Sequence, residues 1–245
     1  MKAVILAAGA GTRLRPLTDT CPKPMLPVGG KPLLAHTLAW LSRYGVHEIA
    51  LNTHHLPDVV RAGLGDGSAY GARLVYSHEQ ELLGTAGAVW RIAERYPNWF
   101  DDTFAVIYGD MLVDFDLGEL ARFHSSRGAL LTMALKQTHT PHSQGMVEID
   151  EQGRVLRFVE KPPAWDGGNV ANAGIYICEP PVVKTIGPGV RDFGHDIIPQ
   201  LLHAGAALYG RPINGVLLDI GTPEAYQQAQ NLIDSSSTPA PTWQG

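Results

Sequence analysis

The 245-residue sequence has few cysteines, no surplus of positive charge and no long uninterrupted hydrophobic run. Its two cysteines, Cys21 and Cys178, can form at most one disulfide, which excludes a disulfide-built scaffold. The net charge of −5 argues against nucleic acid as a partner, because binding it requires a basic surface. Without a run of 18 apolar residues or the features of a signal peptide, we expect a cytoplasmic protein with no membrane partner.

Two common nucleotide-binding motifs are also incomplete. A P-loop requires a Lys-Ser or Lys-Thr pair after its glycines, and none follows Gly9 or Gly11. The dinucleotide fingerprint G-x-G-x-x-G requires a third glycine, where Leu14 stands. The acidic residue that would close the second strand is replaced by Asn52. These departures weigh against a P-loop enzyme and against an NAD-dependent oxidoreductase.

The first 34 residues nevertheless favour phosphate chemistry. An apolar run over 3–8 ends in a glycine-containing turn, whose backbone N–H groups can face an anion. Lys23 stands between two prolines, which restrict the backbone around it and can fix the direction of its ammonium. The side chains and glycines that could meet phosphate in this window are Gly9, Gly11, Thr12, Arg13, Arg15 and Lys23.

Apolar runs alternate with helical patterns over the first 135 residues, which is typical of βαβ units and a mostly parallel sheet. The expected strands are 3–8, 48–52, 72–77, 103–108 and 130–135. The expected helices are 33–44, 57–64, 84–96 and 117–126.

The pattern changes after residue 135. Short strands joined by turns such as 151–153 indicate antiparallel pairing, and we expect them to form a small subdomain laid on the sheet. These strands are 145–149, 155–160 and 171–178. A helix over 196–204, a strand over 216–219 and a helix over 223–235 follow. The Ser/Thr/Pro-rich residues 236–245 are expected to be a disordered tail.

Two aspartates each close a predicted strand. Asp110 follows the strand 103–108 and Gly109, and Asp219 ends the strand 216–219. In open α/β sheets, ligands bind outside the carboxyl ends of the strands. Two carboxylates in such positions are better explained as a pair of metal ligands than as two turn caps.

The segments LAAGAGTRLRPLT and PKPMLPVGGKPLL resemble the signature of the sugar-1-phosphate nucleotidyltransferases, and the resemblance extends to about Ile233. It implies a Rossmann-like, three-layer α/β/α sandwich with a mostly parallel sheet. It also implies a Mg²⁺-dependent reaction in which a nucleoside triphosphate and a sugar 1-phosphate give a nucleoside-diphosphate sugar and pyrophosphate. One catalytic domain is expected over 1–235, with a nucleotide part over 1–135 and a sugar-phosphate part over 136–235.

The resemblance assigns roles to individual residues. It makes Arg13, Lys23 and Asp110 catalytic and gives Mg²⁺ to Asp110 and Asp219, leaving Asp114 and Asp116 as helix-start residues. The implied nucleotide-binding residues are Leu6, Ala8, Gly9, Gly11, Thr12, Arg13, Lys23, Gly84, Thr85, Gly87 and Asp110. The implied sugar-phosphate-binding residues are Gly145, Glu160, Lys161 and Asn172. Thr85 has a second interpretation, as the cap of the helix that begins near it.

The loop LGTAG most resembles guanylyltransferases, so we expect GTP with mannose 1-phosphate or a manno-configured heptose 1-phosphate. A uridylyl- or thymidylyltransferase for glucose, an aminosugar or N-acetylmuramic acid stays open, as does a non-catalytic nucleotide-sugar sensor. A homodimer also stays open. The hexapeptide repeat that extends some relatives is missing, so no acyltransferase or allosteric module is expected.

Overall fold

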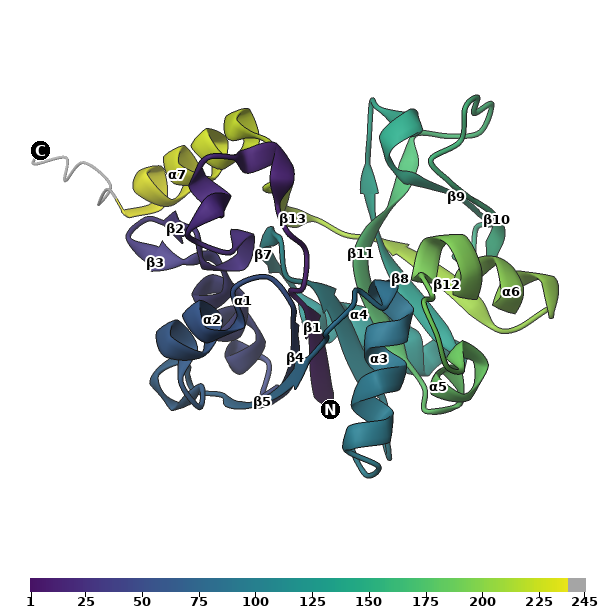
Figure 1. The fold of residues 1–245 in the computed structure, drawn as a ribbon. Helices are drawn as coiled ribbons and strands as arrows, with labels where there is room; N and C mark the ends of the chain where they lie inside the picture. The colour runs from purple at the N-terminus through teal and green to yellow at the C-terminus, as the bar shows by residue number, and fades with distance from the viewer. Residues whose placement is uncertain (238–245) are drawn as a thin grey trace, which may run out of the picture.

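The computed structural model describes residues 1–237 and has three layers, with helices on both faces of a central sheet (Figure 1). The middle of the sheet is parallel. β1 (Lys2–Leu6) lies between β4 (Glu48–Thr53) and β6 (Phe104–Tyr108), and β5 (Arg73–His78) pairs with the far side of β4. The α/β class and the mostly parallel core are therefore confirmed.

The antiparallel strands expected after residue 135 are present, but they continue the central sheet and do not lie on it as a separate layer. The reason is the length of β11 (Val170–Cys178). Its C-terminal half pairs with β6, and its N-terminal half reaches β9 (Gly145–Ile149). β10 (Val155–Glu160) then pairs with β9. On its other edge, β11 pairs with β8 (Leu131–Gln137). β8 also pairs with β12, a strand missed in the sequence, which spans Leu208–Pro212.

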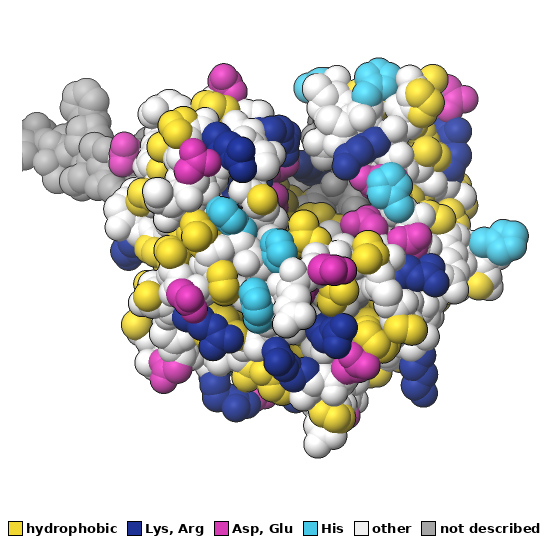
Figure 2. All heavy atoms as spheres, in the orientation of Figure 1, with side chains coloured by type: hydrophobic (Ala, Val, Ile, Leu, Met, Phe, Trp, Pro, Cys, Tyr) yellow, Lys and Arg dark blue, Asp and Glu magenta, His cyan; other side chains and the backbone are white. Residues whose placement is uncertain are grey.

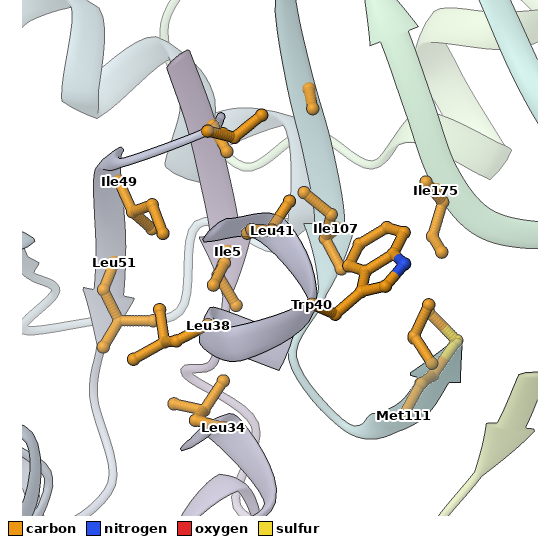
Figure 3. Close-up of a cluster of buried hydrophobic side chains, with 14 of the residues drawn as sticks. Ile5, Leu34, Leu38, Trp40, Leu41, Ile49, Leu51, Ile107, Met111 and Ile175 are labelled. Atoms are coloured by element: carbon orange, nitrogen blue, oxygen red, sulfur yellow. The ribbon is translucent and has the colours of Figure 1, made fainter. Parts of the chain in front are cut away.

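Alternating side chains of the buried strands supply two hydrophobic cores. Ala3 and Ile5 of β1 point to one face, and Val4 points to the other. The first face is covered by α1 (Leu33–Arg43), α2 (Pro57–Leu64) and α4 (Leu117–Arg127). The second is covered by α3 (Gly84–Arg95), α5 (Pro181–Ile186) and α6 (Ile198–His203). In Figure 3, Leu34, Leu38 and Leu41 of α1 lie against Ile5, Ile49 and Leu51 of the sheet.

A third, smaller core lies in the lobe built by the N-terminal loop and the end of the chain. It joins Leu14 and Leu26 of the loop to Ile220 and Ala229. Two short antiparallel sheets support this lobe: β2 (Pro27–Val28) with β3 (Lys31–Pro32), and β7 (Met111–Phe115) with β13 (Gly215–Asp219). The short helical turns of the chain are η1 (Thr12–Leu14), η2 (Leu17–Asp19), η3 (Lys23–Met25), η4 (Ser68–Tyr70), η5 (Pro141–Ser143) and η6 (Phe193–Ile197).

Three local expectations need correction. The strand that ends at Asp219 is half-buried and pairs with β7 outside the central sheet, because it returns to the N-terminal lobe. Asp114 lies within β7 and pairs with Arg43 at 2.6 Å, so it does not start a helix. Asp116 does cap α4, since its Oδ1 accepts the amide N–H of Glu119 at 2.9 Å.

Two further boundaries differ from expectation. The helix expected over 196–204 is split into the wide turn η6 and α6, because Asp192 accepts the amides of Gly194 and His195 and starts the turn earlier. α7 (Pro223–Ser237) runs two residues into the expected tail 236–245, and the rest of that tail lies outside the described residues. Within the described residues, none of the helices combines the length and apolar character needed to cross a membrane.

Candidate active site

Lys23 is the centre of a charged cluster drawn from three distant parts of the chain. It lies in η3, and only 6% of its surface is exposed. Its Nζ donates to Asp110 Oδ2 at 2.7 Å and to Asp219 Oδ1 at 3.4 Å. Asp110 lies just after the central strand β6, and Asp219 ends β13. The two aspartates predicted as a pair therefore converge on one cation.

The cluster fits the donor set of a magnesium ion. Both carboxylates reach the same positively charged group, so both could reach a metal ion near that point. Carboxylate oxygens suit Mg²⁺, which keeps several of its ligands as water or substrate oxygens. Among the residues that the structure describes, no group of three or more acidic, histidine or cysteine side chains forms a closed metal site. Asp110 and Asp219 would thus supply the protein's share of the ligands.

Two hollows meet at this cluster. The first has a volume of about 320 Å³ and lies over the ends of β1 and β6. The second, of about 470 Å³, lies toward β9, β10 and β11. Tyr108 and Asp110 line both. Figure 2 shows the molecule hollowed between its two lobes, with Lys and Arg side chains on both rims. One reacting centre could therefore be reached from both hollows.

Most of the predicted nucleotide-binding residues line the first hollow. These are Leu6, Ala8, Gly9, Lys23, Gly84, Thr85 and Asp110. Gly11, Thr12, Gly87 and Arg13 are not among its lining residues. Gly11 instead allows the loop to pass Lys23, because its φ is +63° and a Cβ there would lie 2.9 Å from the Cβ of Lys23. Arg13 lines the second hollow together with Asp219.

All four predicted sugar-phosphate residues line the second hollow. Glu160 is held tightly there: a Cβ on Gly145 would lie 2.5 Å from its Oε2, and one on Gly194 would lie 2.4 Å from the same atom. Lys161 pairs with Glu160 at 3.6 Å and has a φ of +45°, which is strained for a residue with a side chain. The close approach of two glycines therefore fixes where the Glu160 carboxylate points.

Burial raises the pKa of the Glu160 carboxyl above its usual value, and the negative charge of Asp192 adds to this shift. The positive charges of Lys161 and His195 act in the opposite direction. A carboxyl with a raised pKa is a strong hydrogen-bond acceptor when ionised and can donate a hydrogen bond when protonated. Such a group can recognise hydroxyls of a bound sugar.

Several lining residues were missed in the sequence, although most of them follow a strand rule. Tyr108 ends β6, Asn52 lies near the end of β4, and Glu79 directly follows β5. Asn52 Oδ1 accepts the amide of Ala7 at 2.6 Å, and its Nδ2 donates to Glu79 Oε1 at 2.8 Å. All three lie at the carboxyl ends of parallel strands, where open α/β sheets bind ligands, as Asp110 does.

Asn172 and Tyr108 are connected across the two hollows through Tyr176. The Nδ2 of Asn172 donates to the Tyr176 hydroxyl at 2.7 Å, and that hydroxyl donates to the Tyr108 hydroxyl at 3.4 Å. Burial raises the pKa of the Tyr108 phenol, and the negative charge of Asp192 raises it further. Tyr108 therefore stays protonated at neutral pH and forms a neutral wall between the two hollows.

Thr85 is not a helix cap, since Leu83 occupies the N-cap position of α3. Its hydroxyl donates to Asp192 Oδ2 at 2.7 Å and accepts the amide N–H of Phe193 at 2.9 Å. Gly84 is required by the same neighbouring segment: a Cβ there would lie 2.3 Å from the carbonyl oxygen of Arg191. No local sequence pattern predicts the contact with Arg191 and Asp192, because the two residues are distant in the chain, with Asp192 lying 107 positions from Thr85.

Two curated proteins of similar sequence are sugar-1-phosphate nucleotidyltransferases. The sequence is 38% identical over 242 residues to a UTP–glucose-1-phosphate uridylyltransferase of Synechocystis, covering 94% of this chain and 62% of that protein. It is 37% identical to a mannose-1-phosphate guanylyltransferase of Mycobacterium tuberculosis, covering 99% of this chain and 67% of that protein. The chain thus spans about two thirds of the length of these curated relatives.

Solved structures share the fold over nearly the whole chain. A Bacillus anthracis protein described as a glucose-1-phosphate thymidylyltransferase, solved with sucrose, superposes with a TM-score of 0.85 at 26% identity over 98% of both chains. HddC of Yersinia pseudotuberculosis, complexed with GMP-PN, superposes with a TM-score of 0.77 at 26% identity, covering 95% of this chain and 99% of that one. The sequence profile described as "Nucleotidyl transferase" matches residues 2–236, and the chain therefore belongs to the nucleotidyl transferase family.

Proposed function

We propose that this chain transfers a guanylyl group from GTP to mannose 1-phosphate or to a manno-configured heptose 1-phosphate. An oxygen of the sugar phosphate attacks the α-phosphorus of GTP, and the bond from that phosphorus to the bridging oxygen of the β-phosphate breaks. The products are the GDP-sugar and pyrophosphate. The observation that carries the proposal is the junction at Lys23, Asp110 and Asp219, where the two hollows meet.

The two hollows would bind different substrates through different residues of the chain. The first hollow, lined by Gly84 and Thr85, would take the nucleoside, and the second would take the sugar through Glu160 and Asn172. Lys161 would meet the phosphate of the sugar, because it lines the second hollow and carries positive charge. Arg13 lines the same hollow beside Asp219 and would contact the triphosphate. Holding both substrates in reacting geometry lowers the activation barrier, because their translational and rotational freedom is already lost on binding.

Two anions must approach each other in this reaction, so positive charge is needed at the α-phosphate. Lys23 is the candidate for that role, because its ammonium lies at the junction and its backbone is restricted by two prolines. A Mg²⁺ ion bound by Asp110 and Asp219 would supply further neutralisation of phosphate charge. Removing Lys23 should therefore affect the transition state more than it affects sugar binding.

The assignment of the base is supported by guanylyltransferase relatives in several organisms and by the HddC complex, whose ligand is GMP-PN. A second candidate is uridylyl transfer to glucose 1-phosphate, which the 38%-identical Synechocystis relative favours. The two differ in the base and in the configuration of the sugar, so a substrate panel separates them.

The experiment is pyrophosphate release in Mg²⁺, measured for five nucleoside triphosphates, each combined with a panel of sugar 1-phosphates. We expect one pair, GTP with a manno-configured sugar, to exceed every other pair in kcat/KM. Turnover with UTP and glucose 1-phosphate would replace the guanylyl assignment with the second candidate. Nucleotide binding without turnover across the whole panel would contradict the enzyme and favour a sensor.

A further inference from the structure

Residues 189–194, here called the brace, connect the walls of the two hollows. The brace precedes α6 and includes the first two residues of η6. On one side it contacts residues 80–87, which comprise a loop and the first turn of α3 and are here called the loop 80–87. Leu82, Gly84 and Thr85 of this segment line the first hollow. On the other side it contacts Glu160 and Tyr176, next to the second hollow. No motif in residues 189–194 predicts a role for this segment.

The contact with the loop 80–87 consists of five hydrogen bonds. The Arg191 amide donates to the Leu83 carbonyl at 2.9 Å, and the Arg191 carbonyl accepts the amides of Ala86 and Gly87 at 3.0 and 3.1 Å. The remaining two bonds join the Thr85 hydroxyl to Asp192 Oδ2 and to the Phe193 amide. Gly84 and Gly87 have no side chains, which lets the brace approach this closely. The start of α3 is thus fastened to the brace.

The contact with the second hollow follows two routes. Gly194 lies directly against the Glu160 carboxylate, where a Cβ would come within 2.4 Å of Oε2. Phe193 is fully buried and stacks on Tyr176, with ring centroids 4.9 Å apart, and Tyr176 accepts the hydrogen bond from Asn172. Asp192 holds the turn together, since its Oδ1 accepts the amides of Gly194 and His195. Asp192 and Gly194 are therefore held in the same hydrogen-bonded turn.

We infer that the brace couples the two substrate sites and that Thr85 is its positioning residue on the nucleotide side. Ordering of the loop 80–87 by a nucleotide fixes Asp192, Phe193 and Gly194, which places Glu160 and Asn172 for the sugar phosphate. The second ligand then binds a site that is already ordered, which gives positive cooperativity. This inference rests on the proposed function for the identity of the two ligands, but the mechanical link can be tested without them.

The first test is hydrogen–deuterium exchange of the ligand-free protein. Thr85→Val removes both hydrogen bonds of the hydroxyl at nearly constant shape. We expect it to raise exchange about fivefold in peptides covering 191–197, and also in peptides covering 158–163. Thr85→Ser keeps the hydroxyl and should restore the wild-type pattern. Increased exchange confined to residues 80–87 would overturn the inference.

Thr103→Val is the matched control. Thr103 is also half-buried, and its hydroxyl donates to the carboxylate of Glu179 at 2.6 Å, but it lines neither hollow. The same chemical change should raise exchange around Thr103 and leave the 158–163 peptides unchanged. If the control raises exchange at Glu160 as strongly as Thr85→Val does, the effect is general loosening and the brace has no special role.

The second test measures coupling by calorimetry, using α,β-methylene-GTP with and without mannose 1-phosphate in Mg²⁺. We expect the sugar phosphate to tighten nucleotide binding of the wild type about fivefold or more, and Thr85→Val to bring that factor toward one. A lost direct contact with the nucleotide would weaken both affinities equally and leave the factor unchanged, which would overturn the inference. Failure of both ligands to bind would contradict the proposed substrate pair instead, and the exchange data would still decide on the brace.

Discussion

Lys23 Nζ lies 2.7 Å from Asp110 Oδ2 and also contacts Asp219, so an ammonium fills the space between the two proposed magnesium ligands. A divalent cation bound there would be repelled by that ammonium. We predict that Lys23→Met binds Mn²⁺ at least about tenfold more tightly than the wild type in the absence of nucleotide, because a competing positive charge is removed. Calorimetry with Mn²⁺ measures this directly.

Lys136→Met is the control for this prediction. Lys136 lines the second hollow, and among the residues described it forms no ion pair with either aspartate. Its removal should change Mn²⁺ affinity little. Equal Mn²⁺ affinity in the wild type and Lys23→Met would show that the ammonium and the metal occupy different positions. The metal-free Lys23→Met variant should also unfold at a lower temperature, and Mn²⁺ should reverse this loss, because a ligand of the folded state stabilises it.

Asp110→Ala and Asp219→Ala should each lower kcat/KM in Mg²⁺ by at least about 100-fold, since each removes a proposed ligand of the ion that would neutralise phosphate charge. Asp114→Ala serves as control. Asp114 lies on β7, which pairs with the strand that ends at Asp219, and its exposed carboxylate forms an ion pair with Arg43. Its loss should change kcat/KM by less than about threefold, as exposed ion pairs contribute little. Near-normal turnover of Asp110→Ala and Asp219→Ala would refute the metal assignment.

The central strands could be predicted because their apolar runs are buried on both faces of the sheet. β1 is an example, with Val4 fully buried on one face and Ile5 fully buried on the other. β7 was missed for the opposite reason. It directly follows Asp110, contains the charged Asp114, and forms only by pairing with β13, which lies about a hundred residues later in the chain. Nothing in the local pattern of residues 111–115 records that distant partner.

The candidate site also contains some residues that local sequence predicts and others that it does not. Residues proposed to act through a charged side chain, such as Lys23, Asp110 and Glu160, could be named from the sequence, and all three line the hollows. The brace could not, because it acts mainly through the Arg191 carbonyl and through the missing side chain of Gly194. A backbone carbonyl is present at every residue, and a glycine alone does not reveal what lies against it.

Glu160 provides a test of pH dependence. Its pKa is raised in the folded protein, mainly by burial, so the folded state holds the proton more tightly than the unfolded state does. Stability contributed by that proton is therefore lost as pH rises from the ordinary glutamate pKa through the raised value. The side chain of Glu160→Gln cannot ionise, so the variant does not lose this stability. The melting temperature of the variant minus that of the wild type should therefore increase as pH rises across this window. Thermal unfolding from pH 4 to 8 measures the difference.

A difference in melting temperature between Glu160→Gln and the wild type that stays constant with pH would contradict this prediction. It would mean that ionisation of Glu160 does not affect stability, because Lys161 and His195 fully offset the effect of burial on its pKa. At neutral pH the variant should also show weaker sugar-phosphate binding, because an amide replaces a charged acceptor. The measured quantity is KM for the sugar phosphate at saturating nucleotide.

Gly84→Ala and Gly30→Ala separate backbone strain from contact with the brace. Both glycines have a φ of +75°, so both substitutions incur about 1–2 kcal/mol of left-handed strain. A Cβ at Gly84 would also lie 2.3 Å from the Arg191 carbonyl oxygen, whereas one at Gly30 meets no atom within 4 Å among the described residues. Overpacking should add about 1–3 kcal/mol at Gly84 alone. Urea unfolding gives both values, and equal losses would mean that the brace moves aside freely, which a coupling element between two sites cannot do.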